Sequence, residues 1–166
     1  MNRESRWTVP LLCLAALGCS GRVPLSEGLV RQLPPAEVRN LPCYVSDPIV
    51  LRRVLKAEEK GVTPPHVLKV DKDRRMEEVH IRPDTPGVVV GTSNGKLLVS
   101  FEPPIDGVEL TLRFAVRVHA GKTAYFFEAD QIGEGYDRVA YGGKLYSSDG
   151  ANRGSCLEIE EPQERP

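Results

Sequence analysis

The segment Gly91-Thr92-Ser93-Asn94-Gly95 has the spacing G-x-S-x-G, in which a serine can act as the nucleophile of a hydrolase. The motif needs a strand before the serine and a helix after it, because that turn exposes the hydroxyl group. Here residues 96–101 are mostly apolar and predict a strand instead of a helix. The Asn94-Gly95 pair is typical of a tight hairpin. The sequence therefore predicts a hairpin turn at this position and no catalytic serine.

Other residue types that often form active sites or metal sites are scattered along the chain. His66, His80 and His119 lack the close spacing of metal ligands, and each is expected on the surface or in a turn. Asp71-Lys72-Asp73 begins like a calcium loop, but two arginines follow and no glycine or bidentate glutamate stands in register. It predicts a charged turn. We expect no metal and no cofactor.

Several carboxylates lie in the central and C-terminal parts of the chain, but their spacing pairs none of them across a sheet. A hydrolase acting on envelope polymers remains an alternative, and it requires two of these groups to meet across strands in a concave pocket. The carboxylates concerned are Glu77, Glu78, Glu102, Glu109, Glu128 and Asp130.

Tyrosines cluster in the last third of the chain at Tyr125, Tyr136, Tyr141 and Tyr146. Their first interpretation is core and cross-strand packing. The functional alternative is an aromatic patch that binds a glycan, a peptide or a lipid. A third interpretation is a small-ligand carrier that uses the mouth of a barrel and its tyrosines.

Two cysteines, Cys43 and Cys156, lie near the two ends of the globular part. In an exported protein a disulfide between them would persist. Closing a loop of about a hundred residues stabilises a chain by roughly 4–5 kcal/mol in the chain-entropy model. We therefore predict this disulfide, with two buried thiols as the alternative.

The composition excludes one class of partner. The formal net charge is −1, so no basic surplus favours nucleic acid. After the first twenty residues no apolar run is long enough to cross a bilayer.

The secondary-structure signals are mostly those of strands. Residues 97–101, 110–118 and 123–127 are rich in β-branched and aromatic residues, and the second of these alternates apolar with polar side chains. Turn signals at Asn94-Gly95, Ala120-Gly121 and Gly142-Gly143 separate such runs. This spacing predicts an all-β fold, a single antiparallel β-sandwich or small barrel of about 8–10 strands.

Residues 47–61 are ambiguous. Asp47-Pro48 and Gly61 are typical of the two ends of a helix, and residues 50, 51, 54 and 55 would share one helical face. The β-branched residues among positions 49–54 favour a strand. We favour a strand through about Leu55.

The first twenty residues have the order of an export signal: a weakly basic start, an apolar centre over residues 7–17, and small Gly18 before Cys19. The run ending Leu17-Gly18-Cys19 resembles the lipobox of bacterial lipoproteins. That resemblance implies that Cys19 becomes the acylated N-terminus. Because Ser20, and no aspartate, follows it, the resemblance also favours the outer membrane if the source is a diderm bacterium.

A second, loose resemblance spans most of residues 41–160. Residues 43–51, 81–90 and 139–146 are similar to segments of small, uncharacterised bacterial lipoproteins that are rich in β-structure. The resemblance implies a β domain and carries over no site residue.

These observations predict a signal peptide at residues 1–18, a flexible lipidated tether at 19–40, a β domain at 41–160 and a disordered tail at 161–166. Fully extended, the tether would reach about 65 Å. The expected function is that of a membrane-anchored envelope lipoprotein, a non-enzymatic binding or structural module. Its expected partner is another envelope protein or a glycan.

Overall fold

The structure is a computed structural model of the 166-residue chain, and it describes residues 21–56, 66–71 and 74–161. The predictions for the signal peptide, for Cys19, for the turn at residues 72–73 and for most of the C-terminal tail lie outside these residues. The described part is all-β, as predicted, and consists of two antiparallel sheets with a shared apolar core.

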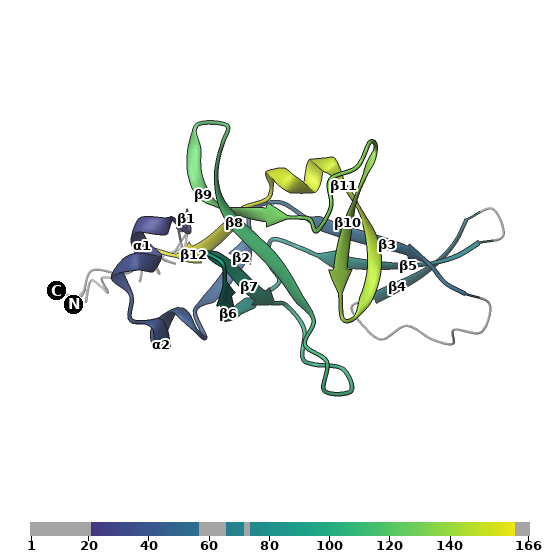
Figure 1. The fold of residues 1–166 in the computed structure, drawn as a ribbon, viewed down its shortest axis with the longest axis horizontal. Coiled ribbons are helices and arrows are strands. Elements are labelled where there is room, and N and C mark those ends of the chain that lie inside the picture. The colour runs from purple at the N-terminus through teal and green to yellow at the C-terminus, as the bar shows by residue number, and fades with distance from the viewer. Residues whose placement is uncertain (1–20, 57–65, 72–73, 162–166) are drawn as a thin grey trace, which may run out of the picture.

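The larger sheet has seven strands and forms the body of the molecule (Figure 1). Its two chain-terminal strands, β1 and β12, are neighbours at one edge. In spatial order the strands are β1 (Arg22–Pro24), β12 (Leu157–Glu160), β2 (Pro42–Val45), β6 (Gly87–Ser93), β7 (Lys96–Ser100), β8 (Thr111–His119) and β9 (Lys122–Glu128).

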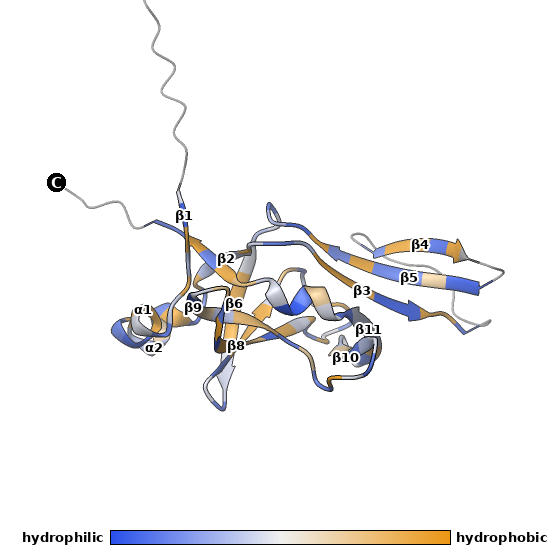
Figure 2. Cartoon of the chain, turned by 90° about the horizontal axis from the view of Figure 1, so that it is seen from above, coloured by the Kyte–Doolittle hydropathy of each residue, from blue (hydrophilic) through white to orange (hydrophobic). Residues whose placement is uncertain are grey.

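The smaller sheet has five strands, and three of them extend well beyond the body (Figure 1, Figure 2). We call the projecting parts of β3, β5 and β4 the arm. In spatial order the strands are β10 (Tyr136–Tyr141), β11 (Lys144–Asp149), β3 (Ile49–Val54), β5 (Arg74–Ile81) and β4 (His66–Asp71).

Residues 21–40 are folded, so the prediction of a flexible tether is wrong from residue 21 onward. After β1, the side chain of Leu25 is completely buried, and its backbone N–H donates to Leu157 at 2.8 Å. Two short helices follow, α1 (Glu27–Gln32) and α2 (Pro35–Val38). Ser26 caps α1 by accepting a hydrogen bond from the N–H of Leu29.

The three hairpin turns form where the sequence predicted them. In each, both turn residues have a positive φ, the conformation that glycine and asparagine tolerate best. The turns are Asn94-Gly95 between β6 and β7, Ala120-Gly121 between β8 and β9, and Gly142-Gly143 between β10 and β11. The G-x-S-x-G segment is therefore part of a hairpin, which confirms the prediction of a turn.

The ambiguous segment is a strand, as we favoured. β3 covers Ile49–Val54 and pairs along its whole length with β5, so that Ile49 and Leu51 are buried on the inner face. Residues 57–61, the remaining part of the ambiguous segment, lie outside the described residues.

The core fills the space between the sheets. The smaller sheet contributes Leu51, Val79 and Ile81, and the larger sheet contributes Val99 and Phe114, all of them almost completely buried. Within the described residues the sheets do not close into a barrel, and twelve strands form instead of the expected 8–10. The sandwich prediction is confirmed, and a carrier that binds its ligand inside a barrel has no support in this architecture.

A short 3-10 helix, η1 (Gly150–Gly154), joins β11 to β12. Its buried Asn152 donates to the carbonyl oxygen of Val50 at 2.9 Å and so ties the connection to β3. None of the described helices is long and apolar enough to span a bilayer.

Candidate functional site

Two adjacent glutamates in β5, Glu77 and Glu78, are the starting point of the two polar clusters in the smaller sheet. Successive side chains of a strand point to opposite faces, so one glutamate faces the body and the other faces outward. Both are buried. A buried carboxylate is stable only when it is paired with cations or hydrogen-bond donors, and both glutamates are surrounded by such groups.

Glu77 lies on the inner face and is bonded through both carboxylate oxygens. Oε1 lies 2.5 Å from Nδ1 of His66, the first residue of β4. Oε2 accepts from Nε of Arg53 in β3 at 2.5 Å and from the hydroxyl of Tyr146 in β11 at 3.1 Å. Four strands of the smaller sheet therefore meet at one carboxylate.

The same histidine connects this group to the larger sheet. Nε2 of His66 lies 3.3 Å from Oε2 of Glu102, which follows β7. The other oxygen of Glu102 accepts a hydrogen bond from the hydroxyl of Tyr141 at 2.5 Å. We call Arg53, His66, Glu77, Glu102, Tyr141 and Tyr146 the inner polar cluster.

The electrostatics of the inner polar cluster favour charged His66 and charged Glu77. The hydrogen bond with Glu102 raises the pKa of His66, the contact with Glu77 raises it further, and both outweigh the opposing effect of burial. Burial raises the pKa of Glu77, but the hydrogen bonds from His66 and Arg53 outweigh it and the net pKa is lowered. An imidazolium between two carboxylates is the protonation state that this geometry supports.

This cluster is closed to solvent. The side chains of His66, Glu77 and Glu102 are only 5%, 3% and 3% exposed. Two carboxylates and a histidine do meet across strands, as the hydrolase alternative requires, but these three side chains are buried and line none of the hollows found among the described residues. The arrangement holds the strands of the arm to the body.

The outer cluster is centred on Glu78. Its carboxylate contacts Arg52 of β3 at 2.9 Å, Lys69 of β4 at 2.6 Å and His80 of its own strand at 2.7 Å. Burial raises the pKa of Glu78, yet the hydrogen bonds from Lys69, Arg52 and His80 bring it down to about 2. The outer face of the arm is thus cross-linked by one carboxylate and three cationic or titratable side chains.

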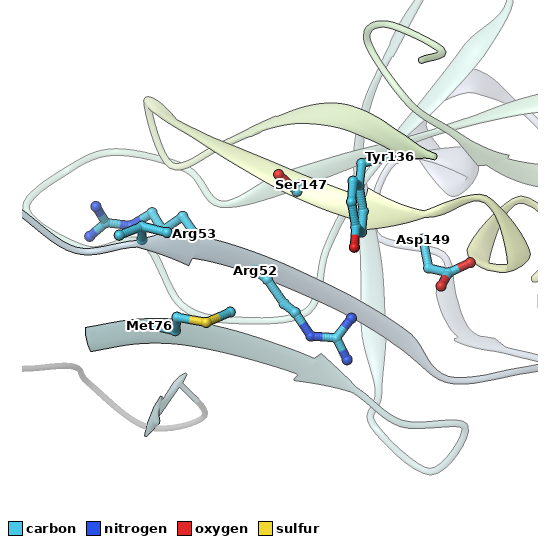
Figure 3. Close-up of a pocket in the computed structure, with 7 residues that line it drawn as sticks. Arg52, Arg53, Met76, Tyr136, Ser147 and Asp149 are labelled. Carbon is cyan, nitrogen blue, oxygen red and sulfur yellow. The ribbon is translucent and has the colours of Figure 1, made fainter. Parts of the chain in front are cut away.

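An open hollow of about 320 Å³ lies on the outer face, between the curled hairpin β10–β11 and the strands β3 and β5. Figure 3 shows Tyr136 of β10 pointing across this hollow toward Arg52 of β3. A second hollow of about 340 Å³ shares Tyr136 and Ser147 with the first, so Tyr136 stands between two adjoining depressions. The other residues that line the first hollow are Arg53, Val54, Met76 and Asp149.

The aromatic patch expected from Tyr125, Tyr136, Tyr141 and Tyr146 does not form. Tyr125, Tyr141 and Tyr146 are buried, whereas Tyr136 is 65% exposed. Tyr141 and Tyr146 pack edge to face inside the molecule, with ring centroids 6.0 Å apart. Of these four tyrosines, only Tyr136 can make an aromatic contact with a ligand at the surface.

Cys43 and Cys156 are free, buried thiols, so the predicted disulfide is not formed in the structure. Cys43 packs in the main core between the sheets, and Cys156 packs in a separate small cluster with Ala124 and Phe126. In the pairing of β2 with β12, position 156 lies opposite Ser46, so alternation directs the two thiols to opposite faces of the sheet. Burial raises the pKa of Cys43 to about 12.

Sequence reasoning missed the inner polar cluster. It placed His66 on the surface or in a turn, and it found no paired carboxylates. No local pattern identifies this cluster, because Glu102 is far from His66 in sequence and meets it only after the two sheets have packed. The alternation of adjacent Glu77 and Glu78 was the one available signal that one of them points inward.

Neither similarity to known proteins nor a cluster of metal-ligating side chains points to a further site among the described residues. Protein-family models, curated proteins and solved structures give no match to the chain. Among the residues that the structure describes, no group of three or more histidine, cysteine, aspartate or glutamate side chains is arranged to hold a metal ion.

Proposed function

We propose that this chain is a lipid-anchored, non-enzymatic binding module of the bacterial cell envelope. The observation that carries the proposal is the signal-like start of the chain, with small Gly18 directly before Cys19. Acylation of Cys19 would bury two or three hydrocarbon chains, each contributing about 0.8 kcal/mol per methylene group, which is enough for stable attachment to a membrane.

An acylated Cys19 would be joined to the β domain by a short stretch of chain. β1 begins at Arg22, three residues after Cys19. Three extended residues span about 10 Å, so an acylated Cys19 would hold the edge formed by β1 and β12 close to the membrane surface. The module would act next to the bilayer and not at the end of a long tether.

Binding, not catalysis, fits the distribution of reactive groups. The paired carboxylates are buried in the inner polar cluster, whereas the accessible features of the smaller sheet include an exposed aromatic ring and the two hollows beside it. Tyr136, the hydroxyl of Ser147 and the carboxylate of Asp149 offer one stacking surface and polar groups on the same face. A glycan or another envelope protein is a suitable partner for such a surface.

The anchor is tested by labelling cells with a palmitate analogue. We expect label on the wild-type chain, none on Cys19→Ser, and unchanged labelling on Cys13→Ser, which is the matched control inside the apolar segment. Fractionation should place the labelled chain with the outer membrane. Equal labelling of Cys19→Ser and the wild type would refute the anchor.

The binding surface is tested separately with a photo-crosslinking amino acid in living cells. Placed at residue 136, it should give a discrete crosslinked product. Placed at Val118, which is similarly exposed on the β8–β9 hairpin, it should not. Products that are the same at both positions, or absent at residue 136, would show that the Tyr136 hollow is not the contact surface.

A further inference from the structure

The last strand of the smaller sheet, β4, has one edge open. It pairs with β5 from His66 to Asp71, and among the described residues no other strand pairs with it. Within the described residues, the backbone N–H and C=O groups on its outer side have no strand partner, as at an open sheet edge that another extended chain can join. The inner polar cluster holds the first residue of this strand through the contact of His66 Nδ1 with Glu77, with Glu102 3.3 Å from Nε2, so the start of the edge is positioned before any partner arrives.

The side chains of β4 are unusually apolar for an exposed edge. Val67 and Leu68 are each 41% exposed and Val70 is 71% exposed, and alternation distributes them over both faces of the strand. Figure 2 shows the apolar colour of β4 at the outside of the arm. Lys69 is the one central charged residue, and proteins that protect an edge from pairing commonly use such a lysine. Here the ammonium group of Lys69 lies 2.6 Å from the carboxylate of Glu78 in the neighbouring strand, so its charge is paired within the sheet.

A hollow of about 780 Å³ lies beside β4. Val67 and Lys69 line it from β4, and His80, Arg82 and Phe101 line it from neighbouring segments. Its position beside the open edge suits a side chain that projects from an added strand, because alternate side chains of such a strand point to the same face. The hollow can therefore select which side chain an added strand carries at that position.

The charge of the arm selects the kind of partner. β3, β5 and β4 carry five arginines and lysines against three carboxylates, in a chain whose formal net charge is −1. Of those carboxylates, Glu77 and Glu78 are buried in contact with cationic groups. The three strands therefore keep an excess of two cationic side chains, although Lys69 is paired with Glu78, and Arg82 just after β5 lies 3.6 Å from Asp84.

We propose that β4 is a docking edge for an extended, acidic segment of a partner protein, which adds as a sixth strand to the smaller sheet. Backbone hydrogen bonds would supply the affinity, and apolar side chains of the segment would occupy the hollow at Val67. Carboxylates of the segment would lie against the cations of the arm. This surface is separate from the Tyr136 hollow and does not require the lipid anchor.

A second copy of the chain fits this edge less well. Pairing β4 with another β4 would place two cationic arms side by side, with Lys69 and Arg74 of each copy near the same residues of the other. An acidic segment would not meet that repulsion, so it is favoured over a second copy. A dimer formed through β4 would show the opposite.

The test uses the purified full-length chain and a fluorescein-labelled probe, acetyl-Glu-Val-Glu-Val-Glu-Val-Glu-amide. We expect saturable binding by fluorescence anisotropy, weaker at higher salt, and slower hydrogen exchange of backbone amides in residues 67–70. Two probe controls should lose at least about tenfold in affinity, namely the same peptide with lysine for glutamate and the same peptide N-methylated at every residue.

The protein control compares two valines of nearly equal exposure, Val70 on β4 (71%) and Val118 on the β8–β9 hairpin (73%). Val70→Asp should weaken probe binding by at least about tenfold, whereas Val118→Asp should leave it unchanged. Equal binding by the N-methylated or lysine peptide, unaffected binding by Val70→Asp, or unprotected amides in residues 67–70 would each overturn the proposal. A concentration-dependent dimer that Val70→Asp abolishes would overturn it in favour of a second copy.

Discussion

Nδ1 of His66 lies 2.5 Å from Oε1 of Glu77, and both side chains are almost completely buried. The contact joins the first residue of β4 to the neighbouring strand β5. Because Nε2 of the same ring faces Glu102 beyond β7, His66 also links the two sheets. An imidazolium flanked by two carboxylates therefore adds a polar link between the arm and the body to the apolar core that the two sheets share.

The first prediction concerns this histidine. His66→Ala leaves Glu77 and Glu102 buried with one cation fewer, and removing one partner of a buried ion pair costs about 3–5 kcal/mol. We expect a loss of that size in the free energy of unfolding, measured by urea denaturation. His119→Ala is the control, because His119 is exposed and packs edge-on against Phe126, and it should cost about 1 kcal/mol or less. Equal losses would show that the contacts of His66 contribute little.

The second prediction concerns the pH dependence of stability. The pKa of His66 is raised in the folded chain from its ordinary value of 6.5, so its stabilisation is complete below about pH 6.5 and is lost as the pH rises through the raised pKa. The pKa of Glu78 is lowered from 4.5 to about 2, so its stabilisation is present above about pH 4.5 and is lost as the pH falls toward 2. Glu77 acts in the same direction as Glu78.

These groups place the stability maximum between about pH 4.5 and 6.5. Urea denaturation from pH 3 to pH 9 measures it. His66→Ala should flatten the alkaline side of the curve and leave the part of the acid side that depends on Glu78, whereas Glu78→Gln should make the acid side less steep and leave the alkaline side. A wild-type curve that rises steadily from pH 6 to pH 9 would contradict the assignment of His66.

The hairpin turns could be predicted from neighbouring residues. The inner polar cluster could not, because its residues meet only when distant parts of the chain pack together. Asn94-Gly95 predicts its own turn because the two residues tolerate the positive φ that the turn requires. Alternation also indicates that Tyr136 and Tyr141, five residues apart in β10, face opposite sides, so a joint patch was not compatible with a strand there. The pairing of His66 with Glu102 needs the packing of one sheet on the other, which no sequence spacing encodes.

The third prediction concerns the two cysteines. Both thiols are buried, and burial raises the pKa of Cys43 to about 12 and also raises that of Cys156, so the reactive thiolate is scarce at neutral pH. We expect both to react slowly with an aromatic disulfide reagent in the native chain and rapidly in urea. Reducing agent should leave the unfolding midpoint unchanged. A mass two hydrogens lower than that of the dithiol would instead show a bridge between them.

The fourth prediction tests whether the segment after Cys19 is part of the fold. Its prolines, serine and glycines suggested a tether, yet the apolar side chain of Leu25 is fully enclosed in the main core. Leu25→Ala removes buried methyl groups and leaves a cavity, so it should cost about 2–5 kcal/mol of unfolding free energy. Leu145→Ala, at a leucine that is 53% exposed, is the control and should change stability by less than about 0.5 kcal/mol.

The same substitution bears on the distance between the domain and a membrane. The backbone of Leu25 donates to Leu157 and accepts from Tyr125, so the segment is held between β12 and β9 and cannot extend while the fold is intact. Hydrogen exchange should therefore protect the amides of Leu25 and Tyr125 to a similar degree in the wild type. Rapid exchange at Leu25, together with a neutral Leu25→Ala, would mean that the segment is free and that the domain can move away from its anchor.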